Sequence, residues 1–189
     1  MGRFGAHYDR LGAYVDAEYM YLSFKDKDIH GISTGLITQL GLLDYAVMYR
    51  VIGQPGGDGP AWLQKGGTPQ VDLYAGGRTL WLKNTIEPGS RSASSTATVT
   101  SPIVGARLSV GLTPKWALLF DGNIGGFNVQ NVKLTGEIIG LAAYRTKLFD
   151  VPAALSFGYK VLNYNVDSGR QFQTSTTLHG PLIAMTLFF

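Results

Sequence analysis

Apolar residues alternate with small or polar residues along most of this chain, which is the period-two pattern of a β-strand with two different faces. In the stretch from Leu11 to Phe24, one face is apolar and the other carries two acids. The apolar face is formed by Leu11, Ala13, Val15, Ala17, Tyr19 and Tyr21. This pattern predicts an antiparallel sheet in which each strand has one apolar and one polar face.

Eight stretches with this alternation occur between Leu11 and the end of the chain. They cover residues 11–24, 35–53, 70–82, 102–112, 116–128, 133–145, 154–166 and 174–189. The segments between them are polar or rich in Gly and Pro, so we expect loops at 25–28, 53–69 and 83–98 and a tight turn at 113–115. Residues 1–10 are expected to form an N-terminal stub that ends in a turn. Residues 11–189 are therefore predicted to be one all-β domain of eight strands, or ten if strands precede Met1.

The last stretch has apolar residues at every second position counted back from the end of the chain. These residues are Phe189, Leu187, Met185, Ile183 and Pro181. Chain termini of soluble domains usually fray, so a strand that runs to the final aromatic residue is unusual there. The closing stretch therefore favours a protein whose last strand is held in place.

Three passages, Ser101–Arg107, Asp121–Phe127 and His179–Phe189, resemble a family of uncharacterised proteobacterial outer-membrane β-barrel proteins. The resemblance implies a transmembrane antiparallel up-and-down β-barrel in the bacterial outer membrane, in contact with outer-membrane lipid and lipopolysaccharide. It also implies that the last strand closes the barrel against the first, and that the barrel assembly machinery reads this strand during insertion. The signal residues would be Ile183, Met185, Leu187 and Phe189. The resemblance implies no known activity.

Composition agrees with a membrane barrel. The chain is 45% hydrophobic and only 15% charged, whereas about 25% of the residues of a soluble domain are charged. No run of about 18 apolar residues is present, so no transmembrane helix is predicted, and a membrane protein of this kind would have to be a closed barrel. A soluble lipocalin-like barrel would place the same two faces the other way round. Alternation alone does not decide between them, but the low charge content and the last strand favour the membrane.

Residues that carry chemistry are scarce. Cysteine is absent, which removes disulfides, thiol catalysis and thiolate metal sites. The histidines His7, His30 and His179 have neither metal-ligand spacing nor a visible Ser/His arrangement, so we expect no metal, cofactor or catalytic site. The net charge of +3 is scattered, so nucleic acid is not an expected partner. These features favour a structural or interaction role with an unidentified protein partner, then a narrow channel, and last a lipid-modifying enzyme.

The polar faces carry acids and bases in nearly equal number, and in a barrel they would point into the lumen. The acids are Asp16, Glu18, Asp44, Asp72, Asp121 and Glu137, and the bases are Arg50, Arg78, Arg107, Arg145 and Lys160. An eight-stranded barrel is only just wide enough for its own side chains. Because an unpaired buried charge is very costly, we expect a salt-bridged plug, in which Arg78 and Arg107 face the same way as Asp72 and Asp121 on strands at or near theirs. The alternative is a polar pathway for ions or small solutes.

Glycines also recur on the predicted inward faces, at Gly76, Gly105, Gly125 and Gly158. Glycine in a strand allows sharp curvature and leaves room for a neighbouring Tyr or Arg side chain. We therefore interpret these glycines as part of the barrel geometry rather than as a phosphate-binding loop.

Overall fold

The structure is a computed structural model, and it describes residues 2–29, 32–53, 69–88, 93–130, 132–167 and 173–188. These residues form nine strands and no helix, in one antiparallel sheet where each strand pairs with its neighbours in sequence. The strands are β1 (Gly2–Tyr8), β2 (Leu11–Ile29), β3 (Ile32–Ile52), β4 (Gln70–Pro88), β5 (Ala93–Gly111), β6 (Trp116–Val129), β7 (Val132–Leu148), β8 (Val151–Asp167) and β9 (Gln173–Leu187).

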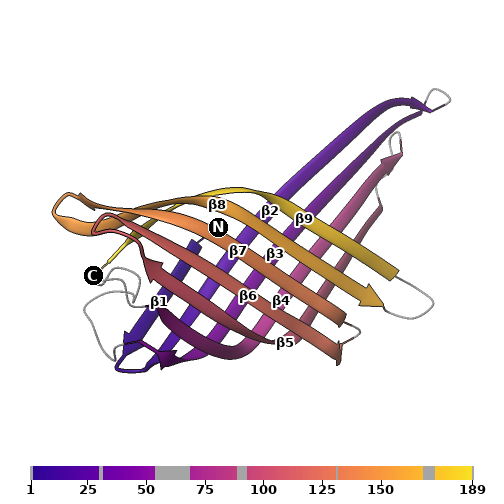
Figure 1. Ribbon diagram of the computed structural model, residues 1–189. Coiled ribbons are helices and arrows are strands. Elements are labelled where there is room, and N and C mark those ends of the chain that lie inside the picture. The colour runs from indigo at the N-terminus through magenta and orange to yellow at the C-terminus, as the bar shows by residue number, and fades with distance from the viewer. Residues whose placement is uncertain are drawn as a thin grey trace.

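The sheet is an up-and-down meander that coils into a half-barrel (Figure 1). Its concave side brings β2, β3 and β4 to face β6, β7 and β8. The edges of the sheet are β1 and β9, and within the described residues β9 pairs with β8 alone. The expected pairing of the last strand with the first is therefore not part of the sheet that the structure describes.

Strands β2 to β9 correspond to the eight strands that the alternation predicts. Residues 2–8, expected to be a stub, form the additional strand β1, which pairs with β2 from Gly2↔Ala17 to Tyr8↔Leu11. The turn expected at its end is present, and Asp9 adopts the left-handed conformation there (φ 56°). The short stretch alternates like the longer ones. Arg3 faces the concave side, where it can form ion pairs, whereas its sequence neighbours do not face that side.

The loops expected at 25–28 and 83–98 are wrong over most of their length. Strand β2 continues to Ile29, β4 continues to Pro88, and β5 begins at Ala93. In 83–98 the reason is that threonine favours a pleated sheet as other β-branched residues do, and that threonine and serine hydroxyls can hydrogen-bond across strands. Thr79 Oγ1 and Thr100 Oγ1 lie 3.0 Å apart in such a pair. Strands β2 to β5 consequently extend well beyond β6 to β9 (Figure 1).

Short turns lie at the opposite end of the sheet. The predicted turn at 113–115 is confirmed: Thr113 Oγ1 accepts hydrogen bonds from the backbone N–H groups of Lys115 (3.2 Å) and Trp116 (3.0 Å). Between β7 and β8, Phe149 (φ 49°) and Asp150 (φ 63°) form a two-residue turn. Positive φ at both positions matches the twist of the adjoining strands.

The two faces of the sheet differ as the alternation predicts. On the convex face, apolar side chains are exposed, as at Val47 (62%) and Ile138 (66%). Their sequence neighbours Met48 and Ile139 point to the concave side and are each 1% exposed. The apolar face of each strand is thus the outer one.

Glycines on the concave face permit close approach between neighbouring strands. A Cβ at Gly76 would overlap the backbone oxygen of Tyr45, and one at Gly158 would overlap the backbone oxygen of Gly140. At Gly105 the space is taken by the ring of Tyr74, as expected for a glycine beside an inward aromatic residue. At Gly76 and Gly158 the space is instead taken by backbone atoms of the neighbouring strand, which the sequence pattern does not indicate.

We predict that Gly158→Ala destabilises the protein by about 1–3 kcal/mol, because the added methyl group forces two strands apart. The change should lower the urea midpoint of the refolded protein. Gly136→Ala is the matched control, since its Cβ would lie 3.6 Å from the oxygen of Asn123, an ordinary contact. Equal midpoints for the two variants would contradict the close approach at Gly158.

Candidate functional site

The concave side holds a network of ion pairs that joins the two facing walls of the half-barrel. The predicted interior residues that belong to ion pairs there include Asp16, Glu18, Asp44, Arg50, Asp72, Arg78, Arg107, Asp121, Glu137 and Lys160. The pairs form three groups, centred on Arg78, on Asp121 and on Arg50.

Arg78 on β4 is completely buried, with 0% of its side chain exposed. Its guanidinium donates to both carboxylate oxygens of Asp44 on the adjacent strand β3, at 2.8 and 2.5 Å. It also donates to Thr135 Oγ1 (2.9 Å) and Glu137 Oε2 (3.1 Å), both on β7 in the facing wall. The planar fork of arginine suits this bidentate pairing, so one side chain forms ion pairs with two acids and bridges the concave space.

Lys160 extends this group across the open side of the sheet. Its ammonium on β8 lies 2.9 Å from Glu137 Oε2 and forms a second ion pair with Glu18. Glu18 belongs to β2 and is the first residue of that strand beyond its pairing with β1. The ion pair therefore links two strands that have no backbone pairing.

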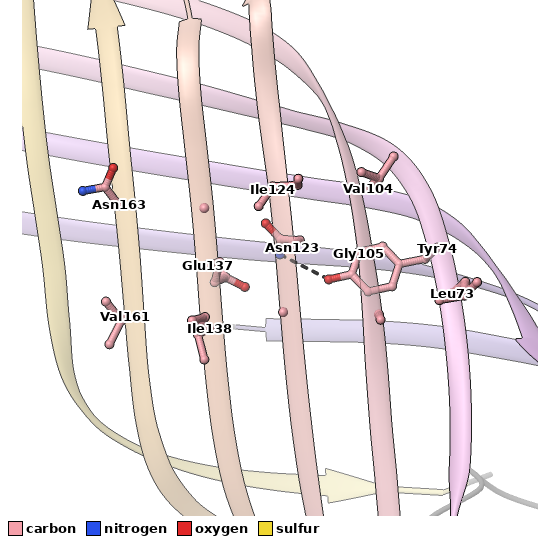
Figure 2. Close-up of a pocket in the computed structure, with 13 residues that line it drawn as sticks. Leu73, Tyr74, Val104, Gly105, Asn123, Ile124, Glu137, Ile138, Val161 and Asn163 are labelled. Carbon is pink, nitrogen blue, oxygen red and sulfur yellow. Dashed lines mark hydrogen bonds between the residues drawn. The ribbon is translucent and has the colours of Figure 1, made fainter. Parts of the chain in front are cut away.

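Asp121 on β6 is the centre of the second group. Arg107 on β5 donates to its Oδ2 from Nε (2.8 Å) and Nη2 (2.6 Å), so Arg107 and Asp121 are partners. Tyr74 on β4 donates its hydroxyl to Oδ1 (2.6 Å) and accepts from Asn123 Nδ2 (3.2 Å). Figure 2 shows this Tyr74–Asn123 bond beside Gly105. The carboxylate thus accepts hydrogen bonds from the two strands β4 and β5.

Arg3 is a further member of this group that the sequence interpretation missed. From β1 it donates to Asp16 Oδ2 at 2.9 and 2.7 Å, and it reaches Asp121 Oδ2 at 3.4 Å. Tyr14 lies between the two arginines, with the guanidinium carbons of Arg3 and Arg107 at 5.2 and 5.3 Å from its ring centre. Both distances fall in the range of cation–π attraction. The sequence signal for Arg3 is the alternation of residues 2–8, a segment too short to show a convincing period.

The third group is a single buried pair near the short turns. Arg50 Nε donates to Asp72 Oδ1 at 2.9 Å, and Nη2 lies 3.5 Å from Oδ2. Both side chains are at most 5% exposed. The partner of Asp72 is therefore Arg50 on the neighbouring strand, and Arg78 instead takes Asp44.

An apolar layer occupies the concave side next to the ion pairs. It corrects the expectation of a wholly polar interior, because its side chains come from both walls and pack on each other. The buried members are Leu42, Leu80, Val132, Leu162 and Tyr164, with Leu40, Val99 and Leu178 packed against them. The interior therefore consists of charged and apolar layers.

Arg145 forms hydrogen bonds at the short-turn end of the sheet. Its Nη1 donates to the backbone oxygens of Thr113 (3.5 Å) and Pro114 (3.2 Å) in the turn between β5 and β6. The parity of β7 does place it on the inward face, but it lies near the end of the strand, where the turn offers carbonyl acceptors. Its place in a central charge network stays a prediction.

The proposed signal residues of the last strand lie on the convex face, with Ile183 78%, Met185 60% and Leu187 38% exposed. Phe189 lies outside the described residues. The reading of this strand by an assembly machinery therefore stays a prediction.

His179 also points outward, and its Nδ1 lies 2.6 Å from the hydroxyl of Tyr159. His30 lies outside the described residues. Within the described ranges, no group of three or more His, Asp or Glu side chains is arranged to hold a metal ion. The described part of the chain also contains no helix long and apolar enough to cross a membrane.

Comparison of the chain with family models, with curated proteins and with solved structures found no match in any of the three.

We predict that Arg78→Met lowers the free energy of unfolding by about 3–5 kcal/mol, because it leaves Asp44 and Glu137 buried without their shared cation. Urea titration of the refolded protein measures the loss. Arg145→Met is the control: it removes hydrogen bonds to the backbone oxygens of Thr113 and Pro114 in an exposed turn, for which we expect about 1 kcal/mol or less. Similar losses for both variants would show that the interior pairing is not what stabilises the fold.

Proposed function

We propose that this chain is a bacterial outer-membrane β-barrel protein whose interior is filled, and that it acts as a scaffold or interaction protein rather than as an open pore. The observation that carries the proposal is the division between the two faces of the sheet. Large apolar side chains cover the convex face, whereas the charged side chains are paired on the concave face. This orientation suits lipid outside and a packed interior, and it is opposite to that of a soluble barrel.

The height of the apolar face supports a membrane location. On β2 the outward apolar residues run from Leu11 to Tyr21. Ten residue steps cover roughly 33 Å along a strand, and a tilt of roughly 40° reduces this to about 25 Å, the height of the apolar band in such barrels. The extended, Ser/Thr-containing ends of β4 and β5 would then lie outside the bilayer.

Aromatic residues mark both borders of this band. At the upper border, Tyr19 and Trp81 lie in one cross-strand row with Gly41 between them, and a Cβ at Gly41 would lie 3.1 Å from the Trp81 ring. Near the short turns, Trp116 packs edge-on against Tyr144 (5.1 Å between ring centres). Trp and Tyr concentrate at membrane–water interfaces because their rings are apolar at one end and polar at the other.

The filled interior supports a scaffold role over transport. Ions would have to pass both paired charges and the apolar layer around Leu42 and Leu162, and a narrow apolar constriction resists wetting. A narrow channel is the second candidate, because the side chains of Arg3 (28% exposed) and Glu18 (22%) remain accessible at the open side of the sheet.

Under this proposal the chain contacts outer-membrane lipid and lipopolysaccharide over its convex face. The barrel assembly machinery would insert it, reading the closing strand through Ile183, Met185, Leu187 and Phe189. The extended hairpins β2–β3 and β4–β5 would present an external surface to an unidentified protein partner.

We predict that Phe157→Arg, at a position 53% exposed on the convex face, destabilises the protein in liposomes by roughly 2–4 kcal/mol. The charge would be placed in the hydrocarbon region. Phe149→Arg makes the same exchange in the short turn, where the side chain is 92% exposed, and should cost at most about 1 kcal/mol. Urea titration of both variants in liposomes provides the comparison.

A Phe157→Arg protein as stable as the parent would reject the membrane location. Recording in a planar bilayer separates the two functional candidates. A scaffold gives no stepwise conductance, whereas a channel conducts and changes its ion selectivity in Arg3→Ala.

A further inference from the structure

The convex face is not smooth. A hollow of about 780 Å³ crosses it from β4 to β8 (Figure 2). Its walls are formed by Leu73, Val104, Ile124, Ile138 and Val161, and its surface is almost entirely carbon. Four strand spacings of about 4.8 Å make it roughly 19 Å long.

Register explains the shape of the hollow. Leu73, Ala106, Gly122, Ile138 and Val161 form one cross-strand row. The adjacent row contains Val104, Ile124 and Gly136 in the same order of strands. Small residues therefore form the floor at three neighbouring points, and large aliphatic side chains stand on either side of it.

The two floor glycines differ from the glycines of the concave face. A Cβ at Gly122 would lie 3.9 Å from its nearest neighbour, the oxygen of Glu137, and one at Gly136 would lie 3.6 Å from the oxygen of Asn123. At Gly158, by contrast, the space is already taken by the backbone of β7. The described residues thus leave the space above Gly122 and Gly136 unused.

One end of the hollow is polar. Asn163 lines it at the β8 side, and its Nδ2 donates to Thr177 Oγ1 on β9 at 2.9 Å. Tyr159 and His179 form a second polar pair on the same two strands. The hollow therefore has an apolar body and a hydrogen-bonding end, the same division as in an acylated lipid.

We propose that this hollow holds one acyl chain of a membrane phospholipid, with the ester end of the chain beside Asn163 and Thr177. The inference rests on the proposed membrane location and adds a defined lipid-binding site to it. The carbon-lined body excludes a polar or charged ligand, for which it offers no partner. A chain lying in the hollow is contacted by side chains on both sides and by the glycine floor, whereas a chain elsewhere on the convex face meets only side-chain tips. More contacts at ordinary van der Waals distance mean stronger retention.

The test fills the hollow without disturbing the fold. Gly136→Leu projects into the unused space, and Gly140→Leu is the matched control. Gly140 lies on the same strand and the same face, outside the hollow, and its Cβ would meet the Phe120 ring at 3.5 Å. Each protein is reconstituted in vesicles of phosphatidylethanolamine and phosphatidylglycerol. The vesicles contain a trace of phospholipid with a photoactivatable diazirine on one acyl chain.

Peptide mass spectrometry then locates the crosslinks. We expect a probe with the diazirine near the chain end to label the segments around Val104 and Ile124. A probe with the group near the ester should label the segment around Asn163. Gly136→Leu should reduce this labelling several-fold, and Gly140→Leu should leave it at the parental level.

Three results would overturn the site. In the first, labelling is uniform over the convex face. In the second, labelling is unchanged in Gly136→Leu. In the third, the hollow is protected from labelling because a second copy of the chain covers it, which chemical crosslinking between chains would detect. Failure of the membrane proposal itself is seen separately, as a protein that does not float with the vesicles. A protein that floats and labels uniformly rejects the acyl-chain site alone.

Discussion

The buried guanidinium of Arg78 imposes the constraint on which the shape of the sheet depends. A buried cation must be paired, and here its partners come from opposite walls, Asp44 on β3 and Glu137 on β7. Lys160 then joins Glu137 to Glu18 on β2. The half-barrel has no backbone pairing between its edge strands in the described residues, so these side chains hold the walls together. The apolar layer around Leu42 and Leu162 can pack only because the walls are brought this close.

Much of the fold follows from a single property of the sequence. Alternation with period two predicts where strands lie and which side chains share a face, because successive residues of a strand point in opposite directions. The Arg107–Asp121 pair was also predictable, since the two residues occur on consecutive strands with matching parity and are direct cross-strand partners. The pairing of Arg78 with Glu137 was not, because it depends on the curvature of the sheet, which alternation does not encode.

The errors have specific physical causes. The loops predicted at 25–28 and 83–98 are wrong because polar residues do not by themselves end a strand. Cross-strand pairing continues through 93–98. At 25–28 the pairing of β2 with β3 reaches Asp26 and resumes, after a register shift, at Ile29. Arg145 has the parity of an inward residue, but parity does not give height along the strand, which decides whether a side chain meets charges or turn carbonyls. The segment containing Arg3 was too short to show a convincing period.

The long hairpins change how the molecule would respond to a mechanical load. Strands β3 and β4 are continuous from the residues that pair inside, Asp44 and Arg78, to the last pair of residues that joins the two strands, Thr34 and Pro88. Ten residue steps separate Asp44 from Thr34, and ten separate Arg78 from Pro88. This distance corresponds to roughly 33 Å of stiff, hydrogen-bonded strand. A force applied at the tip of these hairpins would be transmitted along the strands to the bidentate salt bridge between Asp44 and Arg78. Stress at the surface would therefore be borne by the most deeply buried charge in the protein.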